Sequence, residues 1–279
     1  MKRSALPLTA LLCLSLLTAC GGVPTPGSQS PSPTPGSVSS LPPEATPATL
    51  PTDSVTSTYR VVQEDDGSLL LARSEGSGDI VRMQLLGVTV TRDGGPLSAS
   101  DDDVEEGDLL EITHSAMIQE TFPASFAQVY AVNILTAGHN DLCDLYLDVL
   151  DDLWETDKGL NSDITQLGVD LSGTRLSPSE QAAVAWAFGE EHGITPIQGT
   201  YEALTELGYI TTDESGFPYW KDGCLFSITE SDDSTDEKLC FDAKKWHSGL
   251  GAYFFKDCKA KQDRFGEWSD YTIGAQAIS

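Results

Sequence analysis

The chain has 279 residues, and its 43 acidic against 16 basic side chains give a formal net charge of −27 at pH 7. This balance excludes most nucleic-acid-binding proteins, because the phosphate backbone requires clusters of Lys and Arg. It also argues against electrostatic attraction to an anionic membrane surface. Hydrophobic residues make up 39% of the chain and include five tryptophans, which is enough for a folded core.

The N-terminus has the pattern of an export signal that ends in a lipid attachment site. Lys2 and Arg3 precede a leucine-rich run that is shorter than the roughly 20 apolar residues of a membrane span. Leu17-Thr18-Ala19-Cys20 closes this run and resembles the lipobox of bacterial lipoproteins. The resemblance implies that residues 1–19 are a signal peptide and that the Cys20 thiol carries palmitate-type chains. An ordinary cleaved signal followed by a chance cysteine is the alternative.

Residues 20–56 form the predicted tether. Nine prolines lie between Gly21 and Thr56 among Ser, Thr and Gly, with only two charged residues, so the segment cannot form a core. About 30 such residues span roughly 90 Å as polyproline or roughly 30 Å as a flexible coil. The segment is expected to hold the folded part away from the outer face of the cytoplasmic membrane. A spacer that only improves solubility is the alternative.

Short β-strands are expected throughout residues 57–137. Apolar residues alternate or cluster in runs bounded by turn signals such as Asp66-Gly67 and Asp93-Gly94. The runs cover residues 59–62, 68–72, 80–90, 109–113 and 126–135. Several short strands with glycine-rich turns favour a small all-β barrel, either closed or partly open.

Two neighbouring segments, Gly107–Thr113 and Met117–Ala124, resemble the YobA-like domain of secreted proteins and lipoproteins of Gram-positive bacteria. The resemblance covers residues 57–137 and implies an OB-like β fold. It implies no activity, and an OB-like barrel does not specify a function by itself. Residues 114–116 depart from the family pattern, so the turn there is expected to differ.

The hydrophobic period changes to 3.6 after Gly138, which predicts an α+β domain over residues 138–279. Helices are expected from Leu142, from Ser177-Pro178-Ser179-Glu180, which has the pattern of a capping box, and from Thr200. Strands are expected at 217–228, 239–242, 250–259 and 268–278, and the helices should pack on this antiparallel sheet. A winged helix is the alternative, which the acidic charge disfavours. This part also resembles uncharacterised domains of Firmicute lipoproteins.

The last 42 residues hold seven of the 14 basic residues that remain after the signal peptide is removed, against five acidic ones. The final sheet is therefore expected to be locally positive, with aromatic side chains nearby. It is the candidate surface for a cell-wall glycan or another anionic polymer, with Lys244, Lys245, Trp246, His247, Tyr253 and Trp268 as the binding residues. Alternatively, these lysines only offset the charge of the acidic helices.

No motif indicates a catalytic, cofactor or metal site. The four histidines are scattered, and the acidic run Asp101–Asp108 lacks the EF-hand spacing, so it is interpreted as a solvated loop. The cysteines also lack metal-binding spacing. Among Cys143, Cys224, Cys240 and Cys258, a disulfide between Cys224 and Cys240 is preferred because they lie on consecutive expected strands, and free buried thiols are the alternative.

The sequence thus predicts a lipid-anchored, extracytoplasmic protein of the cell envelope that binds or scaffolds rather than catalyses. Its membrane contact is the lipid, and its partner is a cell-wall glycan or an envelope protein. The alternative is an enzyme that acts on cell-wall or extracellular polymer, with its site in the cleft between the two domains.

Overall fold

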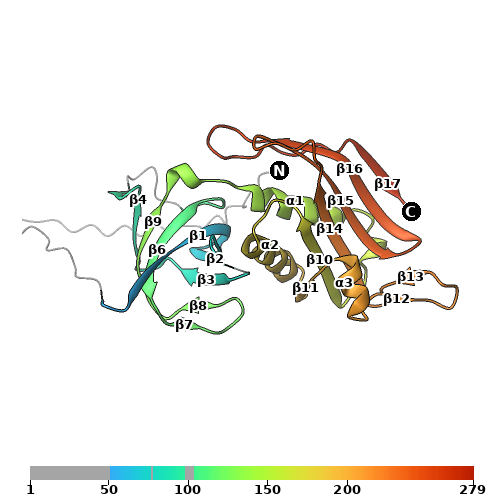
Figure 1. Cartoon of the computed structure of the whole chain (residues 1–279), viewed down its shortest axis with the longest axis horizontal. Coiled ribbons are helices and arrows are strands. Elements are labelled where there is room, and N and C mark those ends of the chain that lie inside the picture. The colour runs from blue at the N-terminus through green and yellow to red at the C-terminus, as the bar shows by residue number, and fades with distance from the viewer. Residues whose placement is uncertain (1–50, 77, 98–103) are drawn as a thin grey trace, which may run out of the picture. The chain divides into compact units, whose positions relative to one another are not determined.

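The computed structural model describes residues 51–76, 78–97 and 104–279, which belong to one compact unit, Leu50–Ser279. Two large β-sheets and three α-helices make up this part of the chain (Figure 1). The described residues contain no helix that is long and apolar enough to cross a membrane. The β-rich character expected from the sequence is confirmed.

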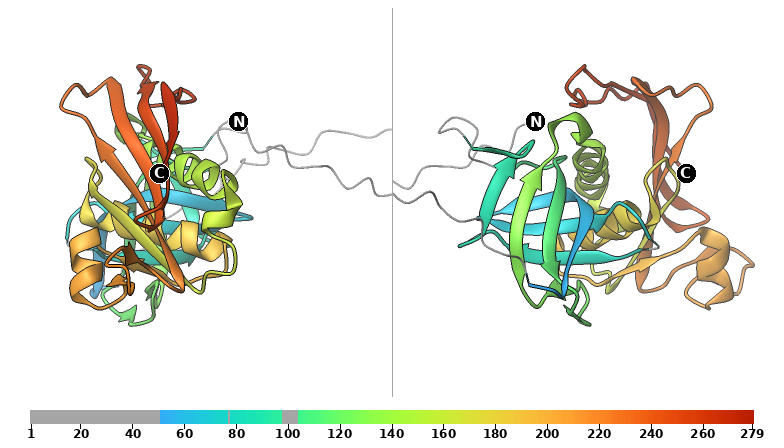
Figure 2. Two further views of the ribbon diagram at one scale, coloured as in Figure 1. Left: turned by 90° about the vertical axis from the view of Figure 1, so that its right-hand side faces the viewer. Right: turned by 60° about the vertical axis from the view of Figure 1, so that its left-hand side comes forward.

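The first sheet curls around an apolar interior (Figure 2). Its long strand β1 pairs with β2 through residues 59–65 and with β6 through residues 54–60, with a register shift after Val61. Because the two halves of one strand have different neighbours, the sheet bends around Tyr59, Leu71 and Ile112. The strand order is β3 (Ile80–Gln84), β2 (Ser68–Arg73), β1 (Ser54–Asp65), β6 (Leu109–Ser115), β9 (Val129–Ile134), β4 (Thr89–Arg92) and β5 (Gly95–Pro96).

A small hairpin of β7 (Ile118–Gln119) and β8 (Ser125–Phe126) accompanies this sheet. Most neighbours in the first sheet are antiparallel, and β4 runs parallel to β9. The expected strand over 80–90 is divided into β3 and β4, because the chain turns at Gly87, which has a positive φ of 78°.

The second sheet is mixed, which corrects the prediction of an antiparallel sheet. Strand β10 (Gln166–Gly173) runs parallel to both β11 (Pro196–Gln198) and β14 (Gly223–Glu230). Helix α2 (Pro178–Glu191) connects β10 to β11, because parallel neighbours require a crossover. The antiparallel part contains β12 (Thr211–Thr212), β13 (Pro218–Tyr219), β15 (Lys238–Ser248), β16 (Gly251–Lys261) and β17 (Ala275–Ile278).

The three expected helices are present as α1 (Leu142–Glu155), α2 (Pro178–Glu191) and α3 (Tyr201–Glu206). Ser177 and Glu180 form the predicted capping box of α2, each side chain accepting a hydrogen bond from the other residue's backbone N–H. Thr200 caps α3 by accepting a hydrogen bond from the N–H of Ala203. These contacts satisfy N–H groups that the first helical turn leaves unpaired.

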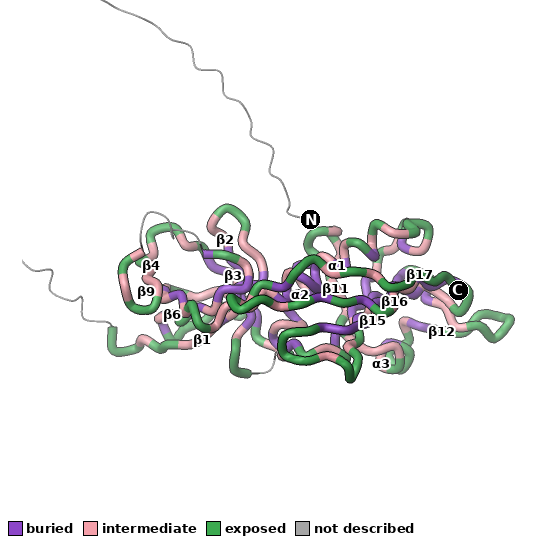
Figure 3. Tube along the Cα trace, turned by 90° about the horizontal axis from the view of Figure 1, so that it is seen from above, coloured by how far each residue is buried: buried purple, intermediate pink, exposed green. Residues whose placement is uncertain are grey.

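Helices α1 and α2 share one apolar core with both sheets (Figure 3). Val62, Leu70 and Ile80 of the first sheet belong to the same buried cluster as Leu150 of α1 and Phe226 of the second sheet. A second cluster on the second sheet includes Leu204 of α3, with Trp220 and Trp246. A domain boundary at residue 138 therefore stays a prediction, because the apolar contacts continue across it.

Candidate functional site

The six residues of the predicted binding surface do not form a common exposed face. Side chains alternate along β15, so Lys244 and Trp246 lie on one side of the sheet while Lys245 lies on the other. Four of the six are buried: Lys245, Trp246, Tyr253 and Trp268. This arrangement corrects the expectation of a positive, aromatic sheet face open to a polymer.

Lys245 has a structural position at the C-terminal end of α1. Its side chain is fully buried, and Nζ donates hydrogen bonds to the carbonyls of Thr156 and Asp157 and, at 2.7 Å, to Oδ1 of Asn161. Burial lowers the pKa of the ammonium group. The surrounding oxygens compensate the lost hydration of the cation and satisfy helix-end carbonyls, which explains a lysine in the core.

The other predicted residues also have internal partners. Nδ1 of His247 lies 2.9 Å from the carbonyl oxygen of Gly223, so His247 contacts the backbone rather than a carboxylate. The hydroxyl of Tyr253 donates to Oε1 of Gln276 at 2.6 Å. The Trp246 ring packs edge-on against Tyr201, with centroids 5.0 Å apart.

The preferred Cys224–Cys240 disulfide does not form, and the four cysteines of the described residues are buried free thiols. Leu225 pairs with Trp246 and Glu230 with Phe241, so the two cysteines lie at opposite ends of the β14–β15 ladder. Seven residues along a strand correspond to about 23 Å. A disulfide requires Cα atoms within about 7 Å. Cys20 and residues 101–103 of the acidic run lie outside the described residues.

A cleft of about 760 Å³ lies where the loop after β16 meets the first sheet. The loop, Gln262–Trp268, contributes six consecutive lining residues, from Gln262 to Glu267. The opposite wall includes Arg60 of β1, Asp108 and His139. The cleft is therefore built from both sequence regions that were expected to be domains.

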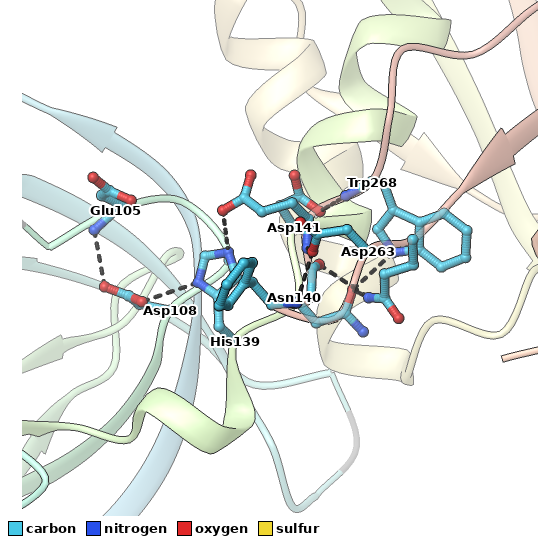
Figure 4. Close-up of polar contacts among 12 residues, drawn as sticks. Glu105, Asp108, His139, Asn140, Asp141, Asp263 and Trp268 are labelled. Carbon is cyan, nitrogen blue, oxygen red and sulfur yellow. Dashed lines mark hydrogen bonds and ion pairs between the residues drawn. The ribbon is translucent and has the colours of Figure 1, made fainter. Parts of the chain in front are cut away.

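His139 lies between two carboxylates on either side of this junction (Figure 4). Its Nδ1 is 3.0 Å from Oδ1 of Asp108, and its Nε2 is 3.0 Å from Oε1 of Glu267. The first contact is a hydrogen bond, and the second has ion-pair distance without hydrogen-bond alignment. The hydrogen bond to Asp108 is the main cause that raises the pKa of His139, and burial opposes it.

Asp108 is itself held in place. It is 3% exposed, and its second carboxylate oxygen accepts a hydrogen bond from the backbone N–H of Glu105 at 3.0 Å. Arg60 stabilises the same corner, because its guanidinium donates to the carbonyls of Gly107 and Gly138 and lies 3.5 Å from Glu180. The wall that carries His139 is therefore preorganised by contacts within the protein.

The residues next to His139 hold the loop. Oδ1 of Asn140 accepts hydrogen bonds from the Trp268 indole N–H at 3.0 Å and from the Gln262 amide at 3.2 Å. Oδ1 of Asp141 accepts the Trp268 backbone N–H at 2.7 Å, while burial raises the pKa of Asp141 to about 6. Gly266 has φ +95°, and a Cβ there would lie 2.1 Å from the His139 carbonyl oxygen, so only glycine fits.

The cleft offers donors, acceptors and an exposed aromatic ring. Phe265 is 62% exposed, and the Arg264 guanidinium lies 4.5 Å from its ring centroid. Arginines and carboxylates both line the walls, and neither Ser nor Cys is among the described lining residues. Within the part of the chain that the structure describes, no group of three or more His, Cys, Asp or Glu is placed to hold a metal ion. The mixture of arginines and carboxylates in the walls suits the recognition of a polar ligand.

Sequence reasoning missed this site. His139 was only one of four scattered histidines, and Asp108 was interpreted as part of a solvated acidic loop. The available signal was weak: His139-Asn140-Asp141 are three adjacent polar residues between an expected strand and an expected helix. Their partner Trp268 is more than 120 residues away in the sequence.

No protein-family model, curated protein or solved structure matches this chain. Function must therefore be argued from the residues and their geometry.

Proposed function

We propose that this chain is a lipid-anchored, extracytoplasmic binding protein of the cell envelope, and that the cleft beside the Gln262–Trp268 loop is its ligand site. The observation that carries the proposal is the cleft itself, which joins an exposed aromatic ring to both hydrogen-bond donors and acceptors. Its volume of about 760 Å³ falls within the roughly 300–1,000 Å³ that is typical of small-ligand sites.

The ligand class that this cleft suits is a glycan. Each sugar hydroxyl can both donate and accept a hydrogen bond, so it can pair with carboxylates such as Asp263 and with guanidinium groups such as Arg264. Phe265 presents a flat apolar surface for the C–H face of a sugar ring. The mixed charge of the walls favours a neutral ligand over a strongly charged polymer.

The first sheet supports an OB-like barrel as the finer description of the N-terminal fold. Its curvature and the β6–β8 region, which contains the YobA-like segments, agree with that proposal. It has seven strands, whereas an OB-fold barrel has five, so the sheet would be an enlarged version. This fold positions one wall of the cleft and adds no function by itself.

Binding is tested by titrating the purified chain with soluble cell-wall oligosaccharides and by co-sedimentation with insoluble cell-wall glycan. Phe265→Ala should weaken binding about tenfold, because a lost aromatic contact costs about 1.5 kcal/mol. Phe217→Ala is the matched control, since Phe217 is 49% exposed and lies outside the cleft lining. Equal weakening in both variants, or no binding by the wild type, would remove support for this site.

Lipid attachment is tested by metabolic labelling with palmitate. The wild type and Cys13→Ala should incorporate label, because Cys13 lies within the segment expected to be removed. Cys20→Ala should not incorporate label. Label that persists in the Cys20 variant contradicts the anchor.

An enzyme that acts on cell-wall or extracellular polymer is the second candidate, favoured by the convergence of Asp108, His139 and Glu267 in one cleft. An imidazolium between two carboxylates cannot accept a proton, so His139 is poorly suited to act as a general base. Asp141, whose pKa is raised to about 6, is not among the residues that line the cleft. New reducing ends from an incubated oligosaccharide, lost in His139→Gln, would establish the enzyme instead.

A further inference from the structure

We propose that protonated His139 holds the Gln262–Trp268 loop in the position where it lines the cleft, and that loss of the proton loosens the loop. This role of His139 would regulate the ligand site of the proposed function, and it rests on that function only for its biological purpose. The loop contributes Asp263, Arg264 and Phe265 to the cleft lining, so the position of the loop determines whether the cleft is complete.

Side-chain contacts from the 139–141 segment hold the loop. His139 faces Glu267, Asp141 accepts the Trp268 backbone N–H, and Asn140 accepts the Trp268 indole N–H and the Gln262 amide. The His139 and Asp141 contacts involve groups that gain or lose a proton. The Asn140 contacts involve no titratable group, so they hold the loop at every pH. Loss of the His139 contact therefore loosens the loop without detaching it.

The charged groups around His139 come from each element packed against it. Asp108 precedes β6, Glu267 belongs to the loop, and Asp141 lies at the start of α1. Arg60 is engaged with backbone carbonyls and Glu180. Arg92 and Arg264 line the same cleft. The imidazolium is thus the cation placed directly between Asp108 and Glu267, two carboxylates that would otherwise face each other.

The direction of the switch follows from the number of N–H groups on the ring. A protonated His139 has two, and it can satisfy Asp108 and attract Glu267 at the same time. A neutral ring has one, which remains with Asp108 because that contact is the aligned hydrogen bond. Glu267 then faces the Nε2 lone pair and the carboxylates of Asp108 and Asp141. Loss of the proton therefore pushes the loop away from the 139–141 segment.

Asp141 makes two opposed contributions to the position of the loop. The hydrogen bond from the Trp268 N–H favours the ionised carboxylate of Asp141, whereas the charge of Glu267 favours its protonated form, and the hydrogen bond has the larger effect. The release of the loop at higher pH is therefore assigned to His139. The hydrogen bond to Asp108 keeps the pKa of His139 above its ordinary value of about 6.5. The loop is therefore held while His139 is protonated, and it loosens as the pH rises through the raised pKa of His139.

Hydrogen exchange on the full mature chain in detergent tests this inference without any ligand. The protection factors of amides 262–268 should fall about tenfold between pH 6 and pH 8.5. Amides 223–230 of β14 should not change. Glu267→Gln removes the negative charge that the neighbouring carboxylates repel, and the side chain is exposed, so the change should not disturb the core. The loop of this variant should therefore stay protected at pH 8.5.

Two histidine variants complete the test. His139→Gln should show low loop protection at both pH values, with protection of α2 reporting that the chain is folded. His192→Gln is the matched control, because His192 also contacts a carboxylate, Asp151, but lies outside the cleft lining; it should retain the wild-type response. The proposed role of His139 is overturned if the wild-type loop is equally protected at both pH values. It is also overturned if Glu267→Gln loses as much loop protection at pH 8.5 as the wild type. Glycan binding is measured in a separate assay, so a failure of the proposed function can be told apart from a failure of the proposed role of His139.

Discussion

Replacement of Asp141 by asparagine should stabilise the protein at neutral pH. Asn has the same shape and its Oδ1 can still accept the Trp268 N–H, but it carries no charge to bury. Burial raises the pKa of Asp141 from its ordinary 3.8 to about 6. A difference of about two units corresponds to about 3 kcal/mol of unfolding free energy. Because the side chain keeps part of its solvent contact, a gain of about 1–2 kcal/mol is expected.

The sign of the pH dependence follows from the direction of the shift. A carboxyl group whose folded pKa is raised favours folding most when it is protonated, so this contribution is complete below about pH 4 and lost as the pH rises through about 6. The Asp141→Asn variant lacks this loss. Its advantage over the wild type should therefore be near zero at pH 4 and largest above pH 7.

Urea unfolding at pH 4, 6 and 7.5 measures the effect, with tryptophan fluorescence as the signal. Glu214→Gln is the matched control, because it removes one negative charge from an exposed position in the β12–β13 hairpin. A variant less stable than the wild type at pH 7.5, or a difference that is the same at all three pH values, would refute the reasoning. The first result would mean that the ionised carboxylate stabilises the junction.

Two further predictions concern buried side chains of α1 and of the second sheet. Lys245→Met should lower the unfolding free energy by about 3 kcal/mol, because it leaves the carbonyls of Thr156 and Asp157 without their buried donor. Lys244→Met is the control: it removes a cation 5.6 Å from the Phe254 ring and should cost less than about 1 kcal/mol in the same urea assay. Equal losses in the two variants would contradict the structural role of Lys245. The four buried thiols should react with an aromatic disulfide reagent only after the chain unfolds. A reducing agent should leave the midpoint of urea unfolding unchanged. A lower midpoint under reducing conditions would reveal a disulfide, whose loss costs about 2–4 kcal/mol.

Helix starts were predictable because their signals are local. The capping box at Ser177 and Glu180 and the cap at Thr200 each satisfy N–H groups within three residues, so the sequence pattern and the physical contact coincide. Strand β10 was missed because its Gly168 and Asp170 interrupt a short apolar run, while its two neighbours come from later parts of the chain. That omission turned a mixed sheet into an expected antiparallel one.

The predicted binding surface shows why composition alone misplaces a site. Basic and aromatic residues near one another in the sequence were taken to share a face, but alternation along β15 separates neighbours and the core covers Lys245 and Trp246. The Asp108–His139–Glu267 contact shows the reverse case, since no motif in the sequence linked these three residues to one another. Long-range pairing brought them together.

Composition and local pattern were enough to establish the acidic charge, the lipobox-like pattern ending at Cys20 and the proline-rich segment, and to predict the β-rich character and the three helix starts. These properties depend on composition or on contacts within about four residues. Long-range packing was needed to show which lysine is buried, that the cysteines stay apart, and that Trp268 contacts Asn140 and Asp141 beside a cleft. Such contacts depend on strand register and on how the loop after β16 meets the first sheet, and neither is encoded in any short stretch of the chain.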